Sequence, residues 1–182
     1  MLIVGKQTES QDKLLWLEGV KDKKGMPAGP GPEGYRFEHR IRINASSEAI
    51  WRVLSDVDRW REWSVLYPEA SGKLKKGNVI NITIFVPGTK KIPSTAVIEE
   101  LATNRMVMFK SVTKLSEKLM YGMRYFTIEQ INENHCIVID GEVVGGVMGV
   151  LSARLMHKNL FNGLRFMNEG LKERVESEFK NR

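Results

Sequence analysis

Five strand-like segments in a row, followed by one long helical segment, constrain the fold of this chain most. They span residues 78–86, 94–101, 105–112, 119–131 and 135–144, and runs such as "PGTKK", "ATN" and "NEN" join them. Short connections make neighbouring strands antiparallel, because a parallel crossover needs a dozen or more residues. The pattern therefore predicts an antiparallel sheet.

One more strand and two short helices are predicted ahead of this run. Residues 35–44, "YRFEHRIRIN", alternate apolar and polar side chains, which is typical of a strand with one wet face. Residues 46–57 then show helical spacing, with Ser46 as N-cap. A second short helix is predicted from Asp58 to Pro68, and it places Trp60 and Trp63 on one face.

The C-terminal segment carries the longest helical signal. Its apolar residues recur at three- and four-residue steps: Ala153, Met156, Leu160, Leu164, Met167, Leu171 and Val175. A sheet with one wet face must bury the other, and only this helix is long enough to cover it. Gly163 and Gly170 on the helix indicate close packing or room for a ligand. We predict an α+β fold, a curved sheet gripping a helix.

Residues 1–34 differ from the rest and are predicted to form an N-terminal extension or arm. Residues 25–34, "GMPAGPGPEG", exclude helix and central strand, whereas residues 14–24, "LLWLEGVKDKK", would suit an amphipathic turn or two of helix. Whether this arm is a functional lid stays open. Residues 35–182 form the predicted ligand-binding domain.

Composition excludes several classes of protein. The longest uncharged stretch, residues 143–153, is far shorter than the ~20 apolar residues of a membrane span, and the N-terminus lacks a signal-peptide core. A single cysteine, Cys136, fits a reducing compartment, so we expect a cytoplasmic protein. The net charge is +6, but the basic residues are spread thinly, and we expect no nucleic-acid binding.

The segment "IRINASSEAIWRVLSDVDRWREW" resembles the opening of the START-like superfamily, also called SRPBCC, which includes birch-pollen-allergen-like, lipid-transport and polyketide cyclase/dehydrase proteins. The segments "GKLKKGNVINITI" and "GLRFMNEGLKERVE" are similar to later parts of the same pattern, so the resemblance covers about residues 36–178. It implies a helix-grip fold with about six to seven strands around the long helix. It also implies an elongated apolar cavity between the sheet and that helix.

Candidate ligand-binding residues follow from this expected cavity. Seven of the nine methionines lie between positions 106 and 167, and flexible methionines suit a surface that adapts to varied apolar shapes. The tryptophans either close the cavity mouth or fill the core. The predicted ligand-binding set is His39, Trp60, Trp63, Met106, Met108, Met123, Tyr125, Met156, His157 and Leu160.

The inward face of two strands is left open by the pattern. On residues 119–131, Tyr121, Met123 and Tyr125 share one face and Arg124 shares the other, where it would be a buried anchor for a carboxylate. On the next strand, Asp140 and Glu142 share a parity, so either is an inward acid or, as we expect, lies on the wet side. His39 has the inward parity, as a ligand contact, a general base or a hydrogen-bonded core histidine.

Enzyme signatures are missing from the chain, and the three dispersed histidines give no metal-ligand spacing, so no cofactor is expected. We predict that the protein binds or transports a small apolar or amphipathic molecule, lipid-like, polyketide-like or aromatic. One alternative is a polyketide cyclase or dehydratase that uses His39, His157 or Tyr125 as proton carrier. Another is an interaction module whose basic residues, Arg36, Arg40, Arg42, Lys90 and Lys91, meet an anionic membrane or an RNA-containing partner. The oligomeric state is not predicted.

Overall fold

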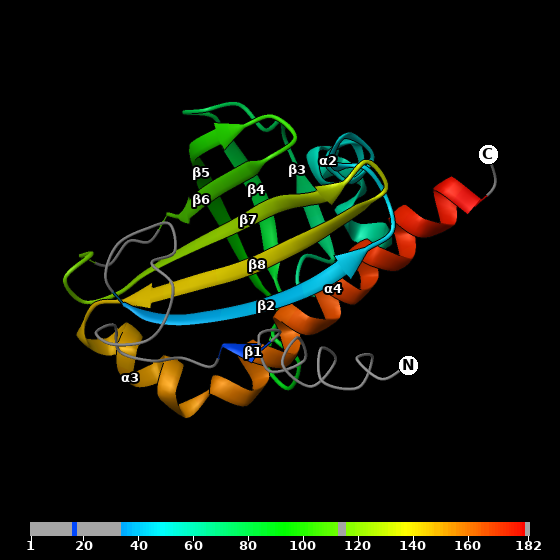
Figure 1. Cartoon of the computed structure of the whole chain (residues 1–182). Coiled ribbons are helices and arrows are strands. Elements are labelled where there is room, and N and C mark those ends of the chain that lie inside the picture. Colours follow the sequence, from blue (N-terminus) through cyan, green and yellow to red (C-terminus); the bar gives the residue numbers. More distant parts are fainter. Residues whose placement is uncertain (1–15, 18–33, 113–115, 181–182) are drawn as a thin grey trace, which may run out of the picture.

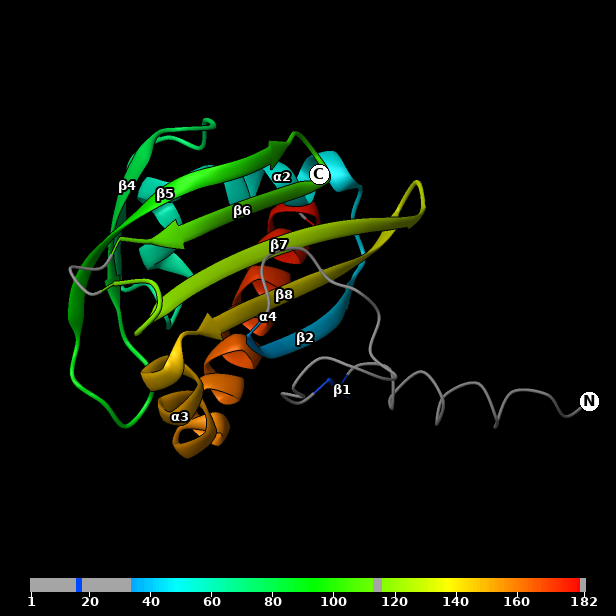
Figure 2. The same cartoon turned by 90° about the vertical axis from the view of Figure 1, so that its left-hand side faces the viewer.

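The computed structural model describes residues 16–17, 34–112 and 116–180, and these form one antiparallel sheet that curls around a long helix (Figures 1 and 2). The strand order is β1-β2-β8-β7-β6-β5-β4-β3. The strands are β1 (Trp16–Leu17), β2 (Tyr35–Ile43), β3 (Glu69–Ser71), β4 (Val79–Ile84), β5 (Ile92–Ala102), β6 (Met106–Ser111), β7 (Tyr121–Asn132) and β8 (His135–Gly145). The predicted α+β helix-grip architecture is confirmed.

Two short helical elements follow β2, as predicted. Helix α2 (Ser47–Ser55) begins at the Ser46 cap, whose hydroxyl accepts a hydrogen bond from the Ala49 N–H at 3.2 Å. The second element, η1 (Val57–Glu62), is a 3₁₀ helix that ends earlier than predicted. Trp60 therefore lies on η1, and Trp63 lies just beyond its end.

The C-terminal helix is divided into two pieces, which differs from the single stripe predicted. Helix α3 (Val147–Leu155) ends at Leu155 with Met156 as its C-cap, and α4 (His157–Lys180) continues to the end of the described residues. The division gives the two helices different directions, with α3 across one end of the sheet and α4 along its inner face (Figure 1).

Glycines let α4 approach its neighbours closely. A Cβ added to Gly170 would lie 2.1 Å from the Trp63 carbonyl oxygen, and one added to Gly163 would lie 2.6 Å from Leu66 Cδ2. Close packing is therefore the reason for both glycines, in accord with the first of the two interpretations that the sequence offered.

The inner face of the sheet is defined by its contacts with α4. Asn168 of α4 hydrogen bonds to His39 of β2, and Met167 of α4 contacts Arg124 of β7. Strand alternation then turns Met123 and Tyr125 to the outer face. The main core lies between the inner face and helices α2 and α4, and it includes Ile43, Leu54, Trp60, Phe109 and Leu171.

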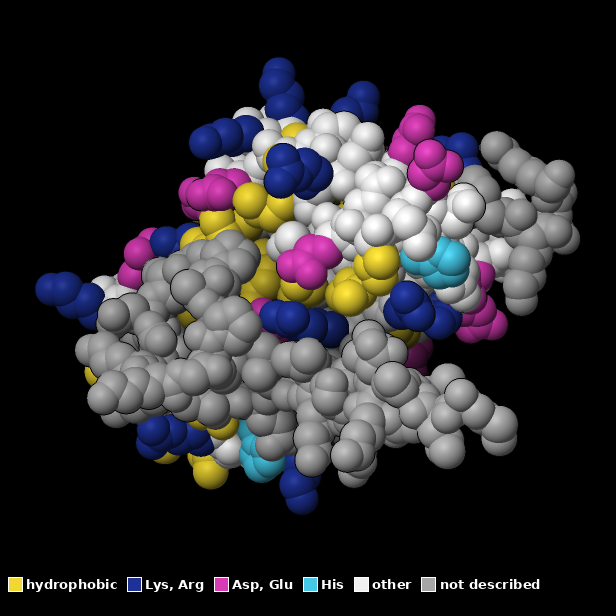
Figure 3. Space-filling model, viewed as in Figure 1, with side chains coloured by type: hydrophobic (Ala, Val, Ile, Leu, Met, Phe, Trp, Pro, Cys, Tyr) yellow, Lys and Arg dark blue, Asp and Glu magenta, His cyan; other side chains and the backbone are white. Residues whose placement is uncertain are grey.

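A second apolar cluster lies on the outer face. It consists of Met108, Met123, Tyr125, Ile139 and Val143, each at most 8% exposed. Figure 3 looks onto the molecule from the same side as Figure 1, and apolar side chains are visible there among acidic and basic ones. The sheet is thus apolar on both faces near its centre.

The described part of the N-terminal segment consists of two residues. Trp16 and Leu17 form strand β1, which pairs antiparallel with His39 and Glu38 of β2, so they are not part of the predicted short helix. The remainder of the predicted arm lies outside the described residues. The division of the chain at residue 34 stays a prediction.

Candidate functional site

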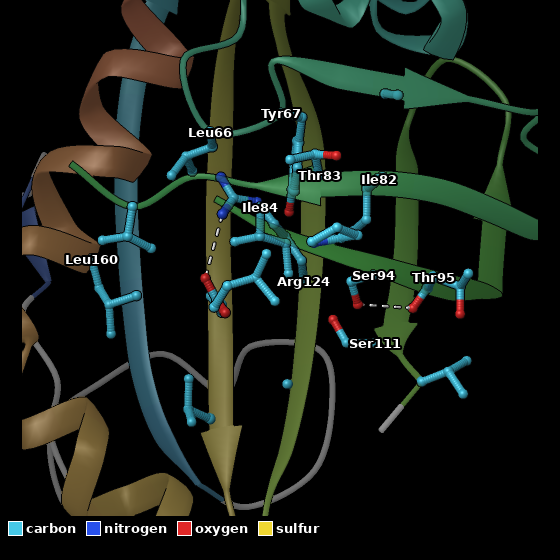
Figure 4. A pocket seen from close by; sticks show the side chains of 18 of the residues that line it. Leu66, Tyr67, Ile82, Thr83, Ile84, Ser94, Thr95, Ser111, Arg124 and Leu160 are labelled. Atoms are coloured by element: carbon cyan, nitrogen blue, oxygen red, sulfur yellow. Dashed lines mark hydrogen bonds and ion pairs between the residues drawn. The ribbon is translucent and has the colours of Figure 1, made fainter. Parts of the chain in front are cut away.

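A cavity of about 1000 Å³ lies between the inner face of the sheet and the C-terminal helices. Strands β3 to β8 form one wall, and residues of α3 and the start of α4 form the other. Figure 4 shows Leu160 of α4 on one side, Ser94, Thr95 and Ser111 on the other, and Arg124 between them. Its volume is at the upper end of the ~300–1,000 Å³ that ligand pockets usually have.

The lining is mainly apolar, with hydroxyl groups at separate points. Ile82, Ile84, Val144, Met156 and Leu160 provide branched and flexible apolar surface. Hydroxyl-bearing side chains interrupt this surface, among them Tyr67, Thr83, Ser94, Thr95 and Ser111. Thr83 is already engaged, since its hydroxyl donates to Glu69 Oε2 at 2.8 Å.

Three charged side chains form an ion cluster on the inner face, consisting of Arg124, Asp140 and Glu142. Arg124 Nη2 donates to Asp140 Oδ2 at 2.5 Å, and Nη1 donates to Glu142 Oε2 at 3.4 Å. Arg124 is 4% exposed and Asp140 is 0% exposed. Arg124 and Glu142 line the cavity, whereas Asp140 is not part of the lining.

Aromatic rings surround the guanidinium of this cluster. Arg124 Cζ lies 5.4 Å from the Tyr67 ring centroid and 5.5 Å from that of Phe126. Both distances are within the ~6 Å of a cation–π contact. Within the described residues, Arg124 Nε and Asp140 Oδ1 have no hydrogen-bond partner. The cluster therefore retains one donor and one acceptor.

Burial sets the protonation of the cluster. Burial raises the pKa of Asp140 to about 7, although Arg124 opposes the shift. Burial also raises the pKa of Glu142, again against Arg124. Burial disfavours the charged form of Arg124, but its acidic neighbours outweigh this effect and raise its pKa. The cluster can thus take up or release a proton near neutral pH.

Two members of the predicted ligand-binding set line the cavity, namely Met156 and Leu160. The two tryptophans lie in the core instead. Trp60 is 0% exposed, its Nε1 donates to the Leu54 carbonyl at 2.8 Å, and its ring stacks on Tyr67 with centroids 5.4 Å apart. Trp60 therefore supports the cavity lining through Tyr67 without reaching the cavity itself.

The two candidate histidines lie apart from the cavity lining. His39 has the predicted inward parity and is 7% exposed, with its Nδ1 3.0 Å from Asn168 Nδ2. Burial and the nearby Arg165 lower the pKa of His39 to about 4, so the ring is neutral at pH 7. His157 Nδ1 lies 3.1 Å from the Arg154 carbonyl, at the junction of α3 and α4.

The remaining four members of the set face away from the cavity, which corrects their predicted position. Met106, Met108, Met123 and Tyr125 lie on the outer face because β7 turns Arg124 and Phe126 inward. The Tyr125 hydroxyl donates to Glu38 Oε2 at 2.6 Å and accepts from Arg36 Nη1 at 2.9 Å. Whether any of the ten residues binds a ligand stays a prediction.

The expectation for Asp140 and Glu142 was wrong, because both point inward with Arg124. No local signal in the sequence indicated this. Counting back from the turn pair Asn132–His135 would place Arg124 opposite Val143, and a register shift between Gln130 and Asn132 brings it opposite Glu142 instead. An opposite-charge pair on the inner face of neighbouring strands is stabilising, which makes burial of the carboxylate feasible.

The basic residues grouped in the interaction-module alternative are not brought together by the sheet. Arg36 and Arg40 lie on β2 and contact Tyr125 and Glu38, respectively. Lys90 and Lys91 precede β5, and three strands separate β5 from β2 in the sheet.

Among the described residues, no group of three or more His, Cys, Asp and Glu side chains is arranged to hold a metal ion. No helix in residues 34–112 or 116–180 is both long and apolar enough to cross a membrane. The cytoplasmic location stays a prediction.

The solved structures most similar to this fold include a START superfamily protein from Mycobacterium smegmatis, at 16% identity and a TM-score of 0.61, covering 79% of this chain and 99% of that one. The Zhui aromatase/cyclase from Streptomyces sp. R1128 matches at 13% identity and a TM-score of 0.63, over 78% and 93% of the two chains. Norcoclaurine synthase from Thalictrum flavum, in complex with dopamine and hydroxybenzaldehyde, matches at 14% identity and a TM-score of 0.60. This match covers 86% of this chain and 98% of that one.

These identities establish likeness of fold alone. No protein with a curated description matches the sequence. A family model does match, and it covers residues 35–176, which is most of the chain. Family and fold together indicate a START-like ligand-binding or polyketide-cyclase-type function. The chain belongs to the polyketide cyclase / dehydrase and lipid transport family.

Proposed function

We propose that the protein binds a small, oxygen-bearing amphipathic molecule in the cavity between the sheet and helices α3 and α4. One observation carries the proposal: a cavity of about 1000 Å³ joins an apolar wall to the buried ion cluster. A solid core would have left no room for a ligand.

The lining supports an amphipathic rather than a purely hydrocarbon ligand. Apolar side chains such as Ile84 and Leu160 would contact the body of the molecule. Ser94, Ser111 and Arg124 would meet its oxygen atoms. A hydrocarbon without oxygen would leave these polar groups unpaired, and each unmade hydrogen bond costs about 1–3 kcal/mol.

Binding is tested by comparing two phenylalanine substitutions on β5. Ser94→Phe adds a ring to the cavity, whereas Val97→Phe adds the same residue type to the other face of the strand, where Val97 pairs with the exposed Val79. We expect the purified wild-type protein and V97F to bind an environment-sensitive apolar dye, and S94F to bind it at least about tenfold more weakly.

Native mass spectrometry and organic extraction of the wild-type protein would then identify any molecule that copurifies. A panel of aromatic and acyl compounds bearing ketone or hydroxyl groups should displace the dye. Equal dye binding by S94F and V97F, with both variants folded, would contradict the proposed site.

A second candidate function, proton-transfer catalysis on a polyketide-like substrate, is favoured by one further observation. The pKa of Asp140 is about 7, which suits a group that exchanges protons at neutral pH. Asp140 does not line the cavity itself, but it contacts Arg124, which does. Asp140 would set the protonation state of the ion cluster, and Glu142 would face the reacting molecule. The earlier candidates His39, His157 and Tyr125 do not converge on this space.

The variant Glu142→Gln separates the two functions. It keeps the size of the side chain and its hydrogen-bonding capacity but removes the exchangeable carboxyl proton. A carrier should bind its ligand with affinity close to that of the wild type. An enzyme should retain binding and lose most of its turnover, measured on poly-β-carbonyl model compounds by absorbance.

A further inference from the structure

Exposed apolar side chains gather at one end of the molecule. Among the residues that the structure describes, eleven large hydrophobic residues are exposed, and eight lie on α3, on the connection between β6 and β7, and at the start of β5. These eight are called the apolar rim: Ile92, Val112, Leu119, Met120, Val147, Met148, Leu151 and Leu155. Exposed hydrophobic residues are normally scattered singly over a protein surface, so a contiguous group of them marks an interaction surface.

Hydrogen bonds hold the three segments of the rim together. The Met148 N–H donates to the Leu119 carbonyl at 3.0 Å, which fixes the β6–β7 connection to the start of α3. The Val112 N–H donates to the Thr95 carbonyl at 2.8 Å, which fixes the other end of the β6–β7 connection to β5. Asn159 Nδ2 donates to the Pro87 carbonyl at 2.8 Å, which holds the β4–β5 connection, just before Ile92, against the start of α4. Figure 2 shows this connection and α3 at the same end of the molecule. The rim is therefore one surface.

The rim surrounds the end of the cavity. Ile92, Val112 and Met120 are exposed and also line the cavity. Helix α3 contributes to both surfaces, since Ala153 lines the cavity while Leu151 and Leu155 are 61% and 79% exposed. Apolar surface thus continues from the cavity to the outside.

The charge beside the rim is positive. No Asp or Glu occurs between Glu142 and Glu169, a segment that contains Arg154 and Lys158. None occurs between Glu69 and Glu99 either, a segment that contains Lys90 and Lys91. All four basic residues are exposed. The β6–β7 connection adds Lys118, and its Glu117 forms an ion pair with Lys110.

We propose that the apolar rim docks onto an anionic lipid bilayer, with α3 lying in the interface. Its exposed apolar side chains would enter the boundary between headgroups and acyl chains, and the basic residues would meet anionic headgroups. Helix α3 has nine residues, too few to span a bilayer, so the contact is peripheral. A second copy of the chain is a poorer partner, because pairing two rims brings like charges together.

Docking would also affect how a ligand enters the cavity, and this consequence rests on the proposed function. A bilayer on the rim would face the end of the cavity, so an amphipathic ligand could pass between them without crossing water. The docking itself needs no ligand, and the two ideas can fail separately.

Vesicle flotation tests the docking. The probes are vesicles of phosphatidylcholine alone and vesicles with roughly one third phosphatidylglycerol. We expect binding to the anionic vesicles, at least about tenfold weaker binding to the neutral ones, and loss of binding as salt rises. The double variant Leu151→Ser/Leu155→Ser should bind anionic vesicles at least about tenfold more weakly than wild type.

Matched controls separate the rim from general surface properties. Val79→Ser/Ile131→Ser removes two exposed apolar side chains at the other ends of β4 and β7 and should bind like wild type. Lys90→Gln/Lys91→Gln should weaken binding, whereas Lys75→Gln/Lys76→Gln, in the β3–β4 connection, should not.

Three results would overturn the proposal. The first is equal vesicle binding by the Leu151/Leu155 variant and wild type. The second is equal binding to both vesicle types. The third is absence of vesicle binding together with a dimer in light scattering that the Leu151/Leu155 variant converts to monomer. Dye binding distinguishes membrane docking from ligand binding in the cavity. The Leu151/Leu155 variant should still bind the dye. Ser94→Phe should lose dye binding but still float with anionic vesicles.

Discussion

Replacing Asp140 by Asn should change how stability depends on pH, because two buried groups titrate with opposite effects. Burial raises the pKa of Asp140 to about 7 and lowers the pKa of His39 to about 4. A carboxyl with a raised pKa holds its proton more tightly in the folded state. Its contribution to stability is therefore full below its unfolded pKa of 3.8 and is lost as the pH rises through 7.

The histidine acts in the opposite direction. His39 resists protonation in the folded state, so stability falls as the pH drops below its unfolded pKa of 6.5 toward 4. Between pH 4.5 and 6.5, linkage gives a loss of about 2.5 kcal/mol from Asp140 and a gain of about 2 kcal/mol from His39. The two contributions nearly cancel. In the variant Asp140→Asn only the His39 contribution remains. The free energy of unfolding of this variant should therefore rise by about 2 kcal/mol from about pH 4.5 to 6.5, apart from the contributions of other groups, which wild type shares.

Urea unfolding at pH 4.5, 5.5 and 6.5, followed by tryptophan fluorescence, measures these free energies. The wild-type free energy of unfolding minus that of Asp140→Asn should fall by about 2.5 kcal/mol across the window. The double variant His39→Gln/Asp140→Asn should be as flat as wild type. A constant difference between wild type and Asp140→Asn would refute the reasoning, because it would mean that Asp140 binds its proton equally in the folded and unfolded states.

Three further substitutions or reagents probe the core. Gly170→Ala should destabilise by about 1–3 kcal/mol in urea unfolding, because its Cβ would lie 2.1 Å from the Trp63 carbonyl oxygen; a gain of about 0.5–1 kcal/mol, the usual result in a helix, would contradict this packing. Trp60→Phe should cost about 2–3 kcal/mol, since it removes the hydrogen bond to Leu54 and part of a fully buried ring, and an unchanged thermal midpoint would refute that. Cys136 is buried and burial raises its pKa, so its thiol should react with a disulfide reagent only after unfolding; rapid reaction in buffer would show the burial to be incorrect.

Local sequence patterns determined the elements of the fold. The two-residue period of residues 35–44, the Ser46 cap and the short turns are local features, so they predict strands and helices without knowledge of their neighbours. The inward parity of His39 followed from the same alternation. The family resemblance depended on the segment around Trp60 and Trp63, and the family match confirms it.

The tertiary structure alone decided which face of β7 and β8 is buried. Both faces of β7 carry large side chains, with Tyr125 on one and Arg124 on the other, so alternation could not rank them. Packing of α4 selected the Arg124 face. Asp140 looks like a solvent-exposed residue in isolation, and its complete burial is feasible only because Arg124 reaches it from the neighbouring strand. Such pairing depends on strand register, and burial depends on distant elements. The family resemblance implied a cavity between the sheet and the C-terminal helix, whereas the charged residues inside it became apparent only in three dimensions.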